Sequence, residues 1–69
     1  MFDTAVFDEL TEAVGVTTET DKAALMGVDR VTLYRYRTRE LNASLDVATR
    51  TAERLGTTVE RLWPRKVAA

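Results

Sequence analysis

The sequence predicts a small all-helical (all-α) domain in which five helices pack around one core. Apolar residues recur at helical spacing, glycine or proline follows the periodic segments, and no stretch shows the two-residue alternation of a half-buried strand. A chain of 69 residues with 45% hydrophobic and 30% charged residues has the composition of one globular domain. We therefore expect a single domain over residues 1–66 and a loose tail over residues 67–69.

The first helix is expected over residues 3–14, with Gly15 as its stop. Phe7 lies off the apolar stripe of this helix. It is therefore expected at the edge of the core or as a contact for a partner. The stripe itself consists of Phe2, Val6, Leu10, Ala13 and Val14.

The second and third helices are expected to follow one another through a tight turn at Gly27. Thr18 and Asp21 have the spacing of a capping box at the start of the second helix, which should end near residue 26. Asp29 is a good N-cap for the third helix. The inward side chains of that helix should be Leu33 and Tyr36, with Val28 plugging the turn.

The fourth helix should begin after Ser44 as N-cap and end at Gly56. A last short helix is expected between the cap Thr58 and the terminator Pro64. The inward side of the fourth helix should consist of Leu45, Ala48, Ala52 and Leu55.

Charge is distributed unevenly along the chain, although the formal net charge is only −1. Residues 1–21 hold six acids and no base, whereas residues 22–66 hold ten bases and five acids, a net of +5. Four arginines fall within ten residues, at positions 30, 35, 37 and 39. Such a cluster is either a solvated helix face or a surface for a polyanion.

Several function classes find no support in the residues. There is no histidine, no cysteine and no glycine-rich phosphate loop, so we expect no enzyme activity, cofactor, metal site or small-molecule substrate. No apolar run approaches the roughly 20 residues that cross a bilayer, and the N-terminus lacks the basic start of a signal peptide. The sequence therefore predicts a cytoplasmic protein without a membrane segment.

The segment from residue 18 to residue 38 has the form of a helix-turn-helix. This unit consists of two helices that meet at a steep angle through a turn containing glycine. A small residue, Ala23, lies four positions before Gly27, and the apolar Val28 and Leu33 lie one and six positions after it. Taken alone, this spacing fits a generic helical hairpin equally well.

A longer stretch, from Thr18 to Trp63, resembles the phage repressor and Cro family of helix-turn-helix regulators, also called the Xre type. The matching motifs are Thr-Glu-Thr-Asp at 18–21, Gly-Val-Asp-Arg at 27–30 and Ala-Glu-Arg-Leu-Gly-Thr-Thr-Val-Glu-Arg-Leu at 52–62. The resemblance implies a compact, five-helix, lambda-repressor-like domain and a transcriptional regulator that binds a double-stranded DNA operator. It also implies that residues 29–38 form the recognition helix in the major groove.

The chain departs from the pattern of this family at three places. Lys22 stands where the family usually has a buried leucine. Arg37 stands where the family usually has a glutamate that pairs with a basic residue on the first helix. In this chain Glu12 or Glu9 of the first helix could form that pair, with the signs of the two charges exchanged. The family's Gly-Lys after the recognition helix is replaced by Arg-Glu-Leu-Asn at 39–42.

If the third helix enters the major groove, its first residues and those one turn later should contact base edges. Arginine suits this task because its planar fork can donate two hydrogen bonds to one guanine, and a valine side chain can contact a thymine methyl group. The predicted base contacts are Asp29, Arg30, Val31, Tyr34 and Arg35. The predicted phosphate contacts are Thr18, Lys22, Thr32, Arg37, Arg39 and Asn42.

The acidic side chains set conditions on this arrangement. The first helix should face away from the duplex because its carboxylates would repel phosphate. Glu19, at the start of the second helix, would also repel a phosphate unless it turns away.

Two alternatives about partners stay open at this stage. Family members commonly bind as dimers, so a weak homodimer on DNA could use Phe7, Trp63 or Val67, and a monomer on one asymmetric site is the other possibility. The same helices could instead form a protein-interaction module of the antitoxin or anti-repressor type. In that case the arginines would pair with acidic groups of a protein partner.

Overall fold

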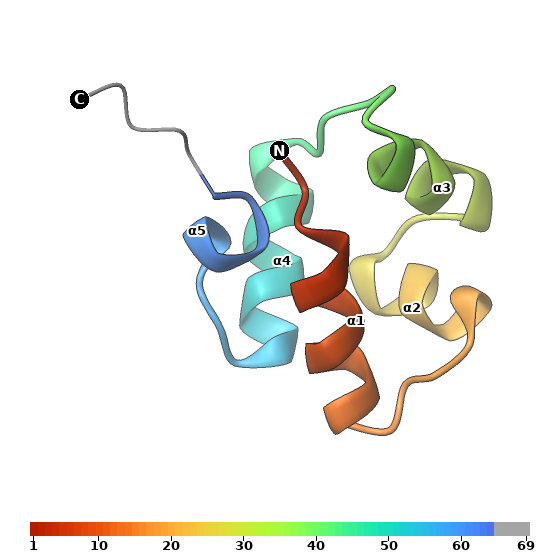
Figure 1. Ribbon diagram of the computed structural model, residues 1–69, viewed down its shortest axis with the longest axis vertical. Coiled ribbons are helices and arrows are strands. Elements are labelled where there is room, and N and C mark those ends of the chain that lie inside the picture. Colours follow the sequence, from red (N-terminus) through yellow and green to blue (C-terminus); the bar gives the residue numbers. More distant parts are fainter. Residues whose placement is uncertain (65–69) are drawn as a thin grey trace.

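The computed structural model describes residues 1–64 and is all-helical over that range. The Cα radius of gyration is 11.3 Å, close to the roughly 11 Å expected for a compact chain of this length. The tail predicted at residues 67–69 lies outside the described residues. Five helices follow in order (Figure 1): α1 Thr4–Ala13, α2 Glu19–Met26, α3 Arg30–Thr38, α4 Leu45–Leu55 and α5 Val59–Leu62.

Side-chain caps fix the starts of the first four helices. Asp3 accepts a hydrogen bond from the amide of Val6 (3.1 Å) at the start of α1. The predicted caps Thr18, Asp29 and Ser44 are confirmed, with bonds of 3.1, 2.7 and 3.3 Å from amides three residues later. Among residues 1–64, no bond returns from the Asp21 carboxylate to Thr18, so only half of the predicted capping box forms.

The first four helices end in one common way, in which a residue with positive φ lets the next amide bond back to the last turn. Glycine has this role at residues 15, 27 and 56, as the sequence predicts. At the end of α3 the same role falls to Arg39, whose φ is 66°. The amide of Glu40 bonds there to the carbonyl of Arg35 (3.0 Å). Arg39 therefore holds a backbone conformation that normally favours glycine.

The core lies where all five helices converge. Phe7, Met26, Leu33 and Leu62 are completely buried in it. Phe2 packs against Phe7 and Trp63, with ring centroids 5.1 Å apart in each case. The amide of Asp3 donates to the carbonyl of Leu62 (2.7 Å), which ties the start of the chain to α5. The expected inward residues of α3 are confirmed, since Leu33 and Tyr36 are both buried.

The expectation for Phe7 was wrong. Phe7 and Thr11 form the buried face of α1, whereas Val6 and Leu10 are only partly buried and Ala13 and Val14 are exposed. Phe2 explains the error, because it precedes the N-cap of α1 and reaches the core from outside the helical period. Including Phe2 in the apolar stripe rotated the predicted buried face of α1 by about one residue.

Leu45 was also misplaced by the sequence pattern. It is 76% exposed, whereas Ala48, Thr51, Ala52 and Leu55 form the buried face of α4. Leu45 is the first residue of α4 and stands beside an open groove, so nothing in the described residues covers it.

Arginines of α4 hold the end of α2 next to the turn. Arg54 donates to the carbonyl of Leu25 (2.6 Å) and Arg50 approaches that of Met26 (3.5 Å). These carbonyls belong to the last turn of α2, where positive charge is favourable. The guanidinium of Arg50 also fills the space that a side chain at Gly27 would need. The angle between α2 and α3 is therefore supported from α4.

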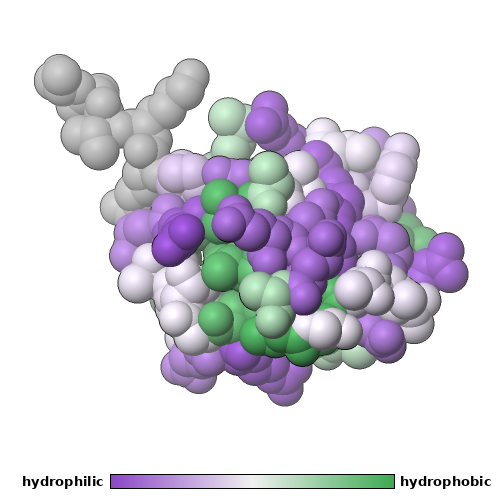
Figure 2. Space-filling model, turned by 60° about the horizontal axis from the view of Figure 1, so that its bottom comes forward, coloured by the Kyte–Doolittle hydropathy of each residue, from purple (hydrophilic) through white to green (hydrophobic). Residues whose placement is uncertain are grey.

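One face of the molecule carries a band of apolar residues flanked by polar ones (Figure 2). Most partly buried apolar residues pack on the core and include Val6, Leu10, Leu25, Val47 and Val59.

Within residues 1–64, no helix has the length and apolar character needed to span a bilayer.

Candidate nucleic-acid interface

Helix α3 has two distinct faces. Its inner face is buried through Leu33 and Tyr36. Its outer face exposes Arg30, Val31, Tyr34 and Arg35, four of the five residues predicted to contact bases. Val31 and Tyr34 are 58% and 61% exposed, so two large side chains with apolar surface stand open to solvent on this face. The outer face therefore presents apolar groups and guanidinium groups together.

Three arginines on and beside this face keep their charge free. Among residues 1–64, Arg30, Arg35 and Arg39 form no salt bridge and donate no side-chain hydrogen bond. Arg30 shares a hollow of about 400 Å³ with Val31, Tyr34 and Glu19. Free donors beside apolar side chains match the mixed polar and methyl edges of base pairs in the major groove.

Asp29, the fifth predicted base contact, is engaged at the start of α3. Its Oδ1 accepts the amide of Thr32 at 2.7 Å. Hydrogen bonds from the Thr32 side chain and amide hold the pKa of Asp29 below its ordinary value of 3.8. The carboxylate is exposed but already serves as a cap. Its role in the structure is to start α3.

Arg37 is turned into the protein, which corrects the expectation that it contacts the DNA backbone. Its side chain is 19% exposed and lies between two carboxylates. Nη1 and Nη2 donate to the two oxygens of Asp8 (3.1 and 2.7 Å), and Nε and Nη2 donate to those of Glu19 (3.1 and 2.7 Å). Nη1 also bonds to Thr4, and the guanidinium lies 5.6 Å from the ring centroid of Phe7. Every nitrogen of this guanidinium is therefore engaged within the domain.

Lys22 is also turned inward, so the predicted phosphate contact is corrected here too. It is 5% exposed, and its Nζ lies 2.9 Å from Asp8 and 3.2 Å from Glu12. Burial alone would lower the pKa of Lys22, but the two carboxylates outweigh that effect and raise it above 10.5. Lys22 thus places an ion pair at the edge of the core.

The predicted pairing of Arg37 with Glu12 was wrong in its partner. The acid on the first helix that binds Arg37 is Asp8, and Glu12 binds Lys22 instead. Asp8 lies one helical turn before Glu12 on α1. The two cations and three acids, Lys22, Arg37, Asp8, Glu12 and Glu19, are called the ion cluster below.

The remaining predicted phosphate contacts differ in what they can offer. Thr18 is exposed at the start of α2, with its hydroxyl oxygen capping the helix. Thr32 is half-buried in the first turn of α3. Arg39 and Asn42 are exposed in the connection to α4. Of these four, only Arg39 brings a positive charge.

The sequence reasoning missed Asp8, Arg50 and Arg54, all of which support the α2–α3 unit. For Asp8, the available signal was Lys22 within the second helix, since a buried ammonium requires a carboxylate nearby. For Arg50 and Arg54, the signal was their spacing of four residues, which places both on one side of α4.

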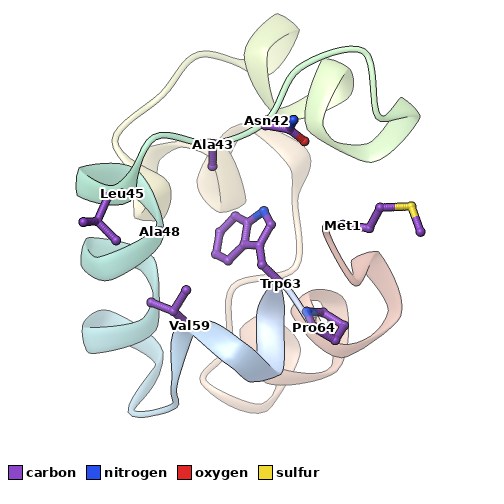
Figure 3. A pocket seen from close by; sticks show the side chains of 8 residues that line it. All are labelled: Met1, Asn42, Ala43, Leu45, Ala48, Val59, Trp63 and Pro64. Atoms are coloured by element: carbon purple, nitrogen blue, oxygen red, sulfur yellow. The ribbon is translucent and has the colours of Figure 1, made fainter. Parts of the chain in front are cut away.

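A second surface feature is an apolar groove of about 800 Å³ on the side of the termini (Figure 3). Trp63 lies at its centre in this view, between α4 and the connection that precedes it. Within the described part of the chain, no charged side chain lines the groove. The lining residues are Met1, Asn42, Ala43, Leu45, Ala48, Val59, Trp63 and Pro64.

The ion cluster predicts an acid-sensitive fold. Burial would raise the pKa of Asp8, but hydrogen bonds from Arg37 and Lys22 and their charges outweigh it and lower the pKa below 3.8. The stabilisation is therefore present above the unfolded pKa of about 3.9 and is lost as the pH falls through the lower folded value. Asp8→Asn should cost about 1–3 kcal/mol at pH 7, a range discounted for the partial exposure of Asp8.

Urea unfolding between pH 7 and pH 2 measures this effect. The loss of stability below pH 4 should be smaller in Asp8→Asn than in the wild type. Glu9→Gln is the matched control, because Glu9 is an exposed acid on the same helix and should change the curve little. Identical acid profiles for Asp8→Asn and the wild type would contradict the assignment.

Comparisons with known protein families, with curated proteins and with solved structures find no match to this chain.

Proposed function

We propose that this chain is a sequence-specific, double-stranded-DNA-binding transcriptional regulator with no catalytic activity. In this proposal α2, the turn at Gly27 and α3 act as a helix-turn-helix, and α3 lies in the major groove. The observation that carries it is the outer face of α3, where Arg30 and Arg35 are unpaired among residues 1–64 and flank the exposed Val31 and Tyr34.

The roles of the side chains follow from their chemistry. Arg30 and Arg35 each donate two hydrogen bonds to O6 and N7 of a guanine, and Val31 contacts a thymine methyl. Tyr34 packs on the groove edge, and Asp29 starts the helix. Arg39, Asn42, Thr32 and the amides at Thr18 contact phosphates and fix the register. Lys22 and Arg37 take no part, since the ion cluster holds both.

Affinity should be modest because few cations face the duplex. With one to three neutralised phosphates, the logarithm of the binding constant should fall with the logarithm of salt at a slope of about −1 to −3. A single domain of this kind also covers only a short site. Both considerations favour two copies on a two-part operator.

We propose that the second copy binds through the groove around Trp63. Among residues 1–64, no charged side chain lines the groove, so two copies can approach there without repulsion between like-charged side chains of its lining. The highly exposed Leu45 at its edge supplies a protruding group for the hollow of the other copy, as a two-fold interface requires. This surface replaces Phe7, which is buried; Val67, the third residue predicted for this contact, lies outside the described residues.

The first prediction of this proposal concerns the two base-reading arginines. Arg30→Ala and Arg35→Ala should each cost about 1–3 kcal/mol of binding to the preferred duplex, or about 5- to 150-fold in affinity. Arg61→Ala removes the same charge from an exposed site on α5 and should cost much less. Fluorescence anisotropy with a duplex selected from a random pool measures all three.

If the three variants lost the same affinity, the arginines would contribute only through their positive charge. That result would contradict base reading by α3. Titration of the wild type with random duplex at low salt tests the protein-partner alternative. Complete absence of salt-dependent binding there would favour a module of the antitoxin or anti-repressor type, in which Val31 and Tyr34 contact a protein.

Arg39 offers a separate prediction because its backbone is strained. Arg39→Gly should raise the free energy of unfolding by about 0.5–1 kcal/mol, since glycine adopts the positive φ without steric cost. Arg39→Ala removes the same charge but keeps the strain. Both variants should lose a similar, several-fold part of the DNA affinity.

Urea unfolding and anisotropy on the same samples separate the two effects. The proposal for Arg39 requires a gain in stability with a loss in affinity for Arg39→Gly. A glycine variant that binds DNA as well as the wild type would remove Arg39 from the interface.

The dimer proposal predicts that Leu45→Glu weakens self-association and binding to two-part sites while leaving unfolding unchanged. Leu41→Glu is the control, because Leu41 is also exposed but does not line the groove. Sedimentation equilibrium, with and without a duplex of two half-sites, measures both. A wild type that stays monomeric on such a duplex would contradict the second copy.

A further inference from the structure

Glu19 occupies an unexpected place for an acid, at the edge of the face proposed to read bases. It is the first residue of α2, yet it lines the same hollow as Arg30, Val31 and Tyr34. Its side chain is 48% exposed. A carboxylate in this place must either weaken DNA binding or contribute to it.

Arg37 holds this carboxylate in one orientation. Both oxygens of Glu19 accept hydrogen bonds from Arg37, at 2.7 and 3.1 Å. Arg37 is itself fixed by both oxygens of Asp8 on α1. Glu19 is therefore preorganised, and the neighbouring guanidinium offsets part of its charge.

Two sites for hydrogen bonds remain on the carboxylate. An ionised carboxylate has about four lone-pair sites, of which the pair with Arg37 uses two. Since about half of the side chain is open to solvent and Glu19 lines the hollow, the remaining sites can accept from a donor that enters there.

The donors in the major groove are the exocyclic amino groups of cytosine (N4) and adenine (N6), whereas thymine O4 and the O6 and N7 of guanine are acceptors. A carboxylate accepts hydrogen bonds from these amino groups and repels the acceptor atoms. Resting on the proposed function, we infer that Glu19 is a specificity-determining residue that selects a base with an exocyclic amino group beside the base contacts of α3.

In this arrangement Glu19 and Arg30 have complementary roles across one hollow. Arg30 selects acceptor edges and Glu19 selects donor edges, with Val31 and Tyr34 between them. Arg37 and Asp8 act as positioning residues, since they orient Glu19 without touching the base.

Selection of bound sequences from a random duplex pool tests this inference with the wild type, Glu19→Gln and Asp21→Asn. At one base pair the wild-type site should be fixed in the orientation that places the amino group of cytosine or adenine beside Glu19, and the base enriched there identifies which amino group is read. Glu19→Gln, which adds donors to the side chain, should relax that position by about tenfold and leave the other positions unchanged. Asp21→Asn removes an exposed acid from the same turn of α2 and should alter no position.

A second measurement uses only the wild-type protein and so does not depend on how a variant folds. Replacing the selected cytosine by 2-pyrimidinone, or the selected adenine by purine, deletes the amino group and should weaken binding about tenfold. If the wild type selects a site but neither the variant nor the base analogue changes that position, the inference on Glu19 is overturned and the proposed function stands. If the wild type selects no sequence at all, the proposed function fails, and this inference with it.

Discussion

The arrangement of the α2–α3 unit depends on one guanidinium, that of Arg37. It joins Asp8 of α1 to Glu19 of α2 while belonging to α3 itself. A partly buried charge is stable only when its hydrogen bonds are complete, and here every nitrogen of the group finds an acceptor. Because the geometry of such a pair is narrow, the cluster favours one orientation of α3 relative to the helices behind it.

The same cluster decides which positive charges remain for a partner. Counted along the sequence, the second part of the chain has a clear excess of bases. In the structure, Lys22 and Arg37 neutralise acids, and Arg54 is bound to a backbone carbonyl. Among residues 1–64, four arginines make no ion pair and donate no side-chain hydrogen bond, and three of them, Arg30, Arg35 and Arg39, lie on the outer face of α3 or at its end. The candidate interface is therefore defined by which cations lack a partner within the domain, and not by the total charge of the chain.

Much of the fold could be predicted from the sequence because helix ends depend on neighbouring residues. Caps such as Asp29 and stops such as Gly27 act within a few positions, so their chemistry is visible in the chain. The side chains that were misjudged, Phe7, Leu45 and Arg37, depend on which elements meet across the core. The outer face of α3 could be predicted from helical spacing, whereas the partner of Arg37 required knowledge of how α1 lies against α3.

The contact between Arg50 and the turn at Gly27 restricts which residues position 27 can accept. A larger residue at position 27 meets two obstacles, a left-handed backbone and a guanidinium that already fills the space. The second obstacle is the far end of a flexible side chain, so Arg50 can swing aside, but its guanidinium then leaves the carbonyl at the end of α2. A larger residue at position 27 should therefore also loosen the packing of α4 on α2, although neither residue belongs to the surface that would face a ligand.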